Sequence, residues 1–135
     1  MSPIYRDTPS TFLRRALGLD AAASGATALL VIGAASPLEG LLGLPAALLR
    51  GAGLVLIPYV AFVAYAATRT TAAPPMVWSI IIVNALWAIA SVLLLLSGWV
   101  APNALGYAFV IGQAVVVALL GELQYVALTR RPATA

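Results

Sequence analysis

Four long apolar segments, separated by short stretches that contain proline and glycine, take up nearly all of this 135-residue chain. Each segment has about 20 residues, which as an α-helix is enough to cross the roughly 30 Å hydrocarbon core of a bilayer. No room remains for a soluble domain. We therefore predict an all-α polytopic membrane protein, a four-transmembrane-helix bundle forming one domain over residues 1–135. The predicted helices are 12–35, 46–68, 76–97 and 104–129.

The composition excludes most other classes of protein. With 63% hydrophobic and 8% charged residues, the chain cannot cover a soluble globule with polar surface. It has no Cys, His or Lys, so thiolate chemistry, the commonest metal ligand and the commonest general base at neutral pH are missing. No nucleophile and base pair stands out among the remaining residues. We predict a non-enzymatic protein with no cofactor, no metal site and no nucleic-acid partner.

The arginines predict the orientation of the chain. Arg50 alone falls on one side of the predicted spans, and all other arginines fall on the opposite side. Because basic residues stay in the cytoplasm, both termini should be cytoplasmic. A chain rich in Ala, Leu and Arg is typical of GC-rich bacteria, which favours a bacterial cytoplasmic (inner) membrane. The arginines on the cytoplasmic side are Arg6, Arg14, Arg15, Arg69, Arg130 and Arg131.

The stretches between the predicted helices carry the signals that end helices. Residues 1–11 are polar with two prolines, so we expect a tail or a segment on the membrane surface. Residues 36–45 should break the first span from the second and lie at the interface. Pro58 lies in the middle of the second predicted helix and should kink it. The first span also resembles a secretory signal peptide, but we expect it to be kept as a span.

Polar side chains in the predicted spans fall at one depth. At about 1.5 Å per residue from the cytoplasmic ends, Asp20 lies roughly 8 Å deep, and Asn84 and Glu122 lie roughly 12 Å deep. These residues come from three different helices, so we predict a polar layer in the cytoplasmic half of the bundle. The other residues in or just below this layer are Gln124, Tyr65 and Tyr125.

Helical phase predicts which of these side chains face protein. Asp20 and Ser24 lie four residues apart, on one stripe that should pack against other helices. On the last helix, Glu122 shares a face with several alanines, whereas Gln113 and Gln124 lie on nearly the opposite face. An amide that faces lipid would lack a hydrogen-bond partner, so one face should meet a second copy. We therefore predict a homo-oligomer.

Two interpretations of the acids stay open. Glu122 and Asp20 could share a proton or cation in a low dielectric, as the site of a small homo-oligomeric channel or coupled transporter. Alternatively, each acid is hydrogen-bonded to neighbours and only holds helices together, which we favour. The predicted function is then structural or accessory, with membrane lipids and an unidentified membrane protein as partners. Arg50 is a candidate for a lipid headgroup or anion, although it can also snorkel to the interface.

Two families invite comparison. The size, the four helices and an acid in the first helix, Asp20, resemble small multidrug-resistance transporters, but the sequence around that acid does not. From the third helix onward the chain resembles uncharacterised small bacterial inner-membrane proteins that are broadly DoxX-like. The shared motifs are Asn84-x-x-Trp87 and a terminal Glu-Leu-Gln-Tyr before basic residues, here Glu122 to Tyr125. This resemblance covers about half of the chain and implies a fold rather than an activity.

Overall fold

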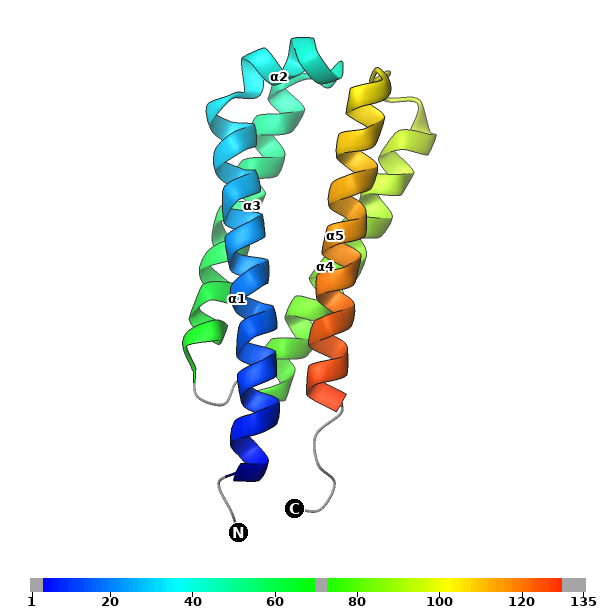
Figure 1. Ribbon diagram of the computed structural model, residues 1–135. Helices are drawn as coiled ribbons and strands as arrows, with labels where there is room; N and C mark the ends of the chain where they lie inside the picture. The colour runs from blue at the N-terminus through cyan, green and yellow to red at the C-terminus, as the bar shows by residue number, and fades with distance from the viewer. Residues whose placement is uncertain (1–3, 70–72, 130–135) are drawn as a thin grey trace.

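The computed structural model describes residues 4–69 and 73–129, with side chains from Thr11 onward, and this part of the chain folds into five α-helices and no strand (Figure 1). The helices are α1 (Ile4–Gly33), α2 (Ala35–Leu42), α3 (Ala46–Thr68), α4 (Pro74–Ser97) and α5 (Ala104–Thr129). Four of them, all except α2, are long and apolar enough to cross a bilayer. The prediction of an all-α, four-span membrane protein is thereby confirmed.

The bounds of α3 and α5 agree with the prediction at both ends, and α4 agrees at its last residue but begins two residues earlier, whereas α1 differs at both ends. The first helix begins at Ile4, so the polar segment that we expected to precede it continues the helix. Residues 36–45 are not simply a break, because most of them form α2. Pro37 lies in the first turn of α2, where a backbone N–H has no partner within the helix, so proline is tolerated there.

The turn after α2 is joined to the loop between α4 and α5. Gly43 has φ +72°, a left-handed conformation that favours glycine, and it ends α2. The carbonyl of Leu42 accepts a bond from the Asn103 backbone N–H at 3.1 Å, and the Leu41 carbonyl accepts one from the Asn103 side chain at 2.8 Å. Asn103 therefore caps α2 and ties the two halves of the molecule at this end.

The long helices form two antiparallel pairs, α1 with α3 and α4 with α5 (Figure 1). Helix α1 also packs on α5, whereas α3 and α4 scarcely touch. One apolar cluster, which includes Leu17, Val63 and Ile80, joins the pairs near the start of α1 and the end of α5. A second cluster, which includes Leu44 and Val110, lies near α2. The polar site lies between these two clusters.

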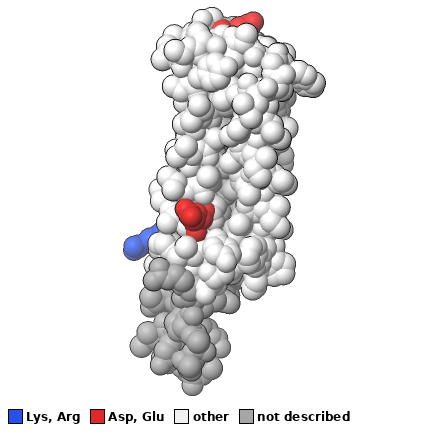
Figure 2. All heavy atoms as spheres, turned by 90° about the vertical axis from the view of Figure 1, so that its right-hand side faces the viewer, with Lys and Arg blue, Asp and Glu red and all other residues white. Residues whose placement is uncertain are grey.

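The outer surface of the spans is apolar. Large apolar side chains are exposed on several helices, for example Leu29 on α1, Leu54 on α3, and Leu86 and Leu96 on α4. Figure 2 shows one side of the molecule as an almost uncharged surface, with acidic atoms at two separate places. Such a surface suits hydrocarbon as its solvent rather than water.

Candidate functional site: a carboxylate held by four helices

The predicted polar layer is centred on Asp20, which is completely buried in the middle of the bundle. Its Oδ1 atom accepts a hydrogen bond from the Ser24 hydroxyl at 2.9 Å. Its Oδ2 atom accepts bonds from the Tyr59 hydroxyl at 2.7 Å, Asn84 Nδ2 at 3.0 Å and Gln124 Nε2 at 2.7 Å. The four donors come from α1, α3, α4 and α5, so a single carboxylate connects all four spans. We call these five residues the Asp20 network.

Further bonds connect the donors to one another. Asn84 Nδ2 also donates to Gln124 Oε1 at 3.0 Å, and the Tyr59 hydroxyl lies 2.9 Å from Asn84 Oδ1. Within the described residues, no buried side-chain nitrogen or oxygen lacks a hydrogen-bond partner. An unpaired polar group in hydrocarbon costs on the order of several kcal/mol. Because every buried polar atom of the network is paired, the network can lie inside a membrane.

Close approach of α4 and α5 brings the amides together. A Cβ atom added at Gly121 would lie 3.2 Å from the Cβ of Asn84, so α5 can pass this near to α4 because residue 121 is glycine. Gln124 follows Gly121 by three residues and therefore points to the same side of α5. A small residue at this crossing thus delivers the Gln124 amide to Asp20.

Gln113 belongs to a second polar cluster within the α4–α5 pair. Its Oε1 accepts a bond from the Trp87 indole N–H at 2.9 Å, and its Nε2 donates to Ser91 Oγ at 2.9 Å and the Val110 carbonyl at 2.8 Å. Both amides of α5 are therefore bonded inside one chain. The face of α5 that we expected to meet a second copy is therefore not the glutamine face but the opposite one, which carries the exposed Glu122.

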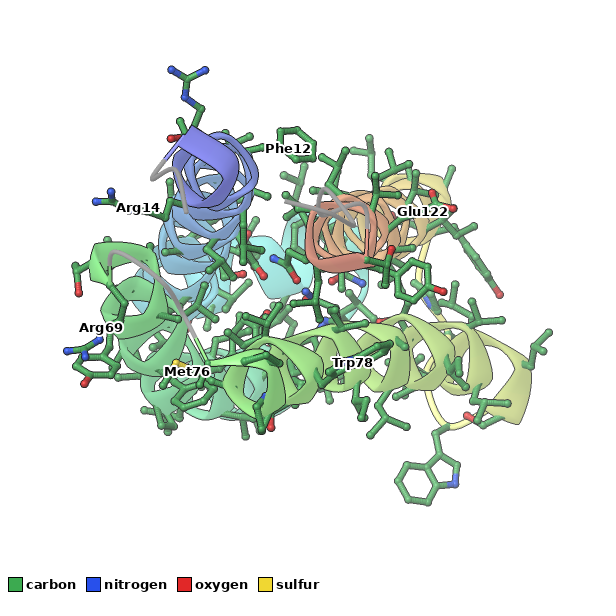
Figure 3. The ribbon with its side chains drawn as sticks, turned by 90° about the horizontal axis from the view of Figure 1, so that it is seen from below. Phe12, Arg14, Arg69, Met76, Trp78 and Glu122 are labelled. Carbon is green, nitrogen blue, oxygen red and sulfur yellow. The ribbon has the colours of Figure 1, made fainter. Side chains whose placement is uncertain are left out.

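The structure does not bring Glu122 to Asp20, so the alternative interpretation, in which these two acids share a proton or cation, is wrong. Glu122 is exposed and points outward from α5 (Figure 3). Residues two positions apart in a helix point in directions that differ by about 200°. Gln124 is buried, so Glu122 cannot also face the core. Depth placed both residues in one layer, and the sequence analysis left open which of the two polar faces of α5 points inward; the structure turns the face of Gln113 and Gln124 inward.

The two predicted tyrosines also lie outside the Asp20 network. Tyr125 is 46% exposed and makes an edge-to-face contact with Trp78, with ring centroids 5.6 Å apart. Tyr65 is 50% exposed, and the Arg69 guanidinium lies 5.4 Å from its ring centroid. These rings belong to the outer surface of the bundle, near the ends of α3 and α5. Of the six predicted site residues, the structure assembles Asp20, Asn84 and Gln124.

Tyr59 is the network residue that the sequence analysis missed. It follows Pro58 in an apolar stretch of α3, and no polar neighbour marks it. The signal available in the sequence was spacing, because Tyr59, Val63 and Ala66 lie at i, i+4 and i+7 and so share one face of α3. The structure shows that this face points inward, since Val63 and Ala66 are fully buried.

Arg50 lies at the other end of the bundle. Its Nη2 donates a bond to Ser36 Oγ at 3.0 Å, and the residue is exposed. Glu39, at the same end, accepts a bond at its Oε1 from the Ala46 backbone N–H at 3.2 Å. The Arg50 guanidinium keeps further N–H groups for solvent or a lipid headgroup, as the prediction requires.

A cavity of about 170 Å³ adjoins the Asp20 network between the two helix pairs. Ser24, Tyr59 and Asn84 form its polar end, and Trp87 and Gln113 form part of its wall. A second cavity of about 100 Å³ continues toward α2 and shares four lining residues with the first. The shared residues are Thr27, Leu56, Trp87 and Gln113.

Both motifs that carried the family resemblance contribute to these clusters. Asn84 and Gln124 bond Asp20, and Trp87 bonds Gln113. Comparison of the chain with protein-family models, with curated proteins and with solved structures found no match. The DoxX-like resemblance therefore stays a prediction that rests on its motifs, and what the chain itself establishes is a four-span membrane protein with a buried carboxylate at its centre.

Proposed function

We propose that this chain is a non-enzymatic, structural or accessory protein of the bacterial inner membrane, with both termini in the cytoplasm. The observation that carries the proposal is the Asp20 carboxylate, which accepts four hydrogen bonds from four spans. The hydrogen of Ser24 and both hydrogens of Asn84 Nδ2 are used within the network. An acid with its oxygens occupied in this way holds helices together and has little freedom to act on a substrate.

A coupled channel or transporter is the second candidate, and one observation favours it. The cavity reaches three members of the Asp20 network, so a space that can hold water-sized molecules lies directly beside the network. The coupling residue would then be Asp20 without Glu122, because Glu122 is exposed and does not line the cavity.

Ion flux distinguishes the two candidates. In liposomes that carry the purified protein, we expect proton and monovalent-cation flux no greater than in empty vesicles, because the paired carboxylate offers an ion no free oxygen pair. Asp20→Asn and Glu122→Gln remove one charge each, in the network and on the surface, and should leave this result unchanged. Flux by the wild type that persists in Glu122→Gln and disappears in Asp20→Asn would establish the transporter instead.

Self-association is part of the proposal, and Glu122 supports it. Its exposed carboxylate lies on an apolar face of α5, where contact with hydrocarbon is costly and a second copy could cover it. We expect Glu122→Leu to shift dimers toward monomers by at least about threefold, the effect of one membrane hydrogen bond of roughly 0.6 kcal/mol. Subunit counting by photobleaching in liposomes measures this shift.

Glu39→Leu is the matched control for this experiment. It makes the same chemical change at an exposed site in α2, outside the four long spans. The dimer fraction should stay at the wild-type value in this variant. A wild type that is monomeric at every protein-to-lipid ratio, or a Glu122→Leu variant that associates as the wild type does, would refute self-association through this face.

A further inference from the structure

The cavity beside the Asp20 network opens toward the lipid-facing surface. Val55 on α3 and Val83 on α4 both line it, and they are 61% and 41% exposed. This is also where the two helix pairs are least in contact, since α3 and α4 scarcely touch. A molecule dissolved in the bilayer could therefore enter between α3 and α4 without crossing the polar network. At about 170 Å³, the cavity is comparable to an engineered protein cavity of about 150 Å³ that binds benzene.

The polar groups of the cavity wall have used all their hydrogens. The Ser24 hydroxyl donates to Asp20, the Thr27 hydroxyl to the Ala23 carbonyl, and the Tyr59 hydroxyl within the Asp20 network. The same holds for the side-chain N–H groups, which donate to other atoms of the chain. The residues whose donor hydrogens are all used within the chain are Ser24, Thr27, Tyr59, Asn84, Trp87 and Gln113.

Hydroxyl oxygens, in contrast, still have lone pairs to offer. Each hydroxyl has one hydrogen and two lone pairs, so Ser24, Thr27 and Tyr59 can accept bonds from a molecule in the cavity but cannot donate to it. The carboxylate behind them is held only by neutral groups, so its negative potential also favours the positive end of a donor group.

We propose that this cavity binds a small lipophilic molecule that carries a hydrogen-bond donor, such as a hydroxyl group, and that reaches it from the bilayer. The donor group lies against the oxygens of Ser24, Thr27 and Tyr59, and the apolar body lies among the side chains that open toward lipid, Val55 and Val83. A molecule of the same size that only accepts hydrogen bonds finds no partner there and leaves its polar atom unsatisfied.

Cyclohexanol and methoxycyclohexane are suitable probes, since the alcohol donates a hydrogen bond and the ether only accepts one. Trp87 lines the cavity, so a chain with Trp78→Phe and Trp99→Phe reports binding through one indole. Both replaced residues are exposed and lie outside the cavity. We expect cyclohexanol to change the Trp87 fluorescence saturably in micelles and to bind about three- to tenfold more tightly than the ether, the ratio that one hydrogen bond supplies.

Two further variants make the test specific. Gly112 lines the cavity, and a Cβ there meets no atom within 4 Å, so Gly112→Leu should fill space and abolish the saturable signal, leaving only partitioning into micelles. Thr27→Val keeps the side-chain shape and loses a hydroxyl bonded only to its own helix. This variant should keep binding of the ether and lower the preference for the alcohol, since one of the three hydroxyl oxygens that accept the bond is lost.

Two results would overturn the proposal. One is the absence of saturable binding by either probe in a chain whose circular dichroism and elution match the wild type. The other is equal affinity of the wild-type cavity for the alcohol and the ether, which would show a cavity without preference for donors. Neither result depends on the ion-flux experiment, so this proposal and the proposed function can fail separately.

Discussion

Replacing Asp20 with leucine should lower the free energy of unfolding by about 2–4 kcal/mol, taking three interhelical bonds at roughly 0.6 kcal/mol each as the lower bound and unpaired buried amides as the upper. The side chain is fully buried, and its loss removes the acceptor for donors on all four spans. The amides of Asn84 and Gln124 then remain in a water-free interior with fewer partners. Equilibrium unfolding in mixed micelles measures the change.

Two comparisons test the physical reason for this loss. Asp20→Asn keeps an acceptor oxygen and should cost less than Asp20→Leu. The triple variant Asp20→Leu, Asn84→Leu, Gln124→Leu removes donors and acceptors together and should recover part of the stability, since an apolar replacement of both partners can be nearly neutral. Should Asp20→Leu cost no more than the surface change Glu122→Leu, the network would not be what fastens the helix pairs.

Replacing Gly106 with alanine should lower the free energy of unfolding by about 1–3 kcal/mol, the usual cost of overpacking. A Cβ atom at this position would overlap the carbonyl oxygen of Leu42 and lie 2.6 Å from the Cβ of Pro102. Neither neighbour is the free end of a flexible side chain, so α5 and α2 must separate. That movement also strains the bonds from Asn103 to Leu41 and Leu42. Thermal unfolding in detergent measures the loss.

Gly112→Ala is the matched control for Gly106→Ala, because it makes the same change six residues later on α5. A Cβ at Gly112 meets nothing within 4 Å, so the variant should be about 0.5–1 kcal/mol more stable than the wild type through helix propensity alone. Opposite signs for the two variants are expected. A stabilising Gly106→Ala would mean that α2 does not pack on α5 as described.

The spans themselves could be predicted because their length and composition depend only on the thickness of the bilayer. Their faces were harder to predict, because lipid and protein interior are both apolar. Leu119 and Leu120 adjoin on α5, yet the first is exposed and the second buried, and nothing in their chemistry distinguishes them. The same ambiguity explains why the inward face of α5 stayed undecided and why Tyr59 was missed.

Depth, in contrast, was a reliable guide. Asp20, Asn84 and Gln124 come from three separate helices and were placed in one layer by counting residues from the helix ends, and the structure brings them into contact. Counting works because every residue adds the same rise along a helix, whatever its neighbours are. Rotation about the helix axis depends on tertiary packing, which no single helix specifies.

The partners of Asp20 become available in a fixed order as the chain is made. Ser24 is 4 residues away along the chain, Tyr59 39, Asn84 64 and Gln124 104. Each newly inserted span after the first, α3, α4 and then α5, thus brings one more donor to the same carboxylate. Only α5 supplies the donor Gln124, so a chain that ends before α5 offers the Asp20 carboxylate one hydrogen-bond donor fewer. The free-energy cost of placing the Asp20 carboxylate in the membrane is therefore lowest only after α5 has been synthesised and has packed against the other helices.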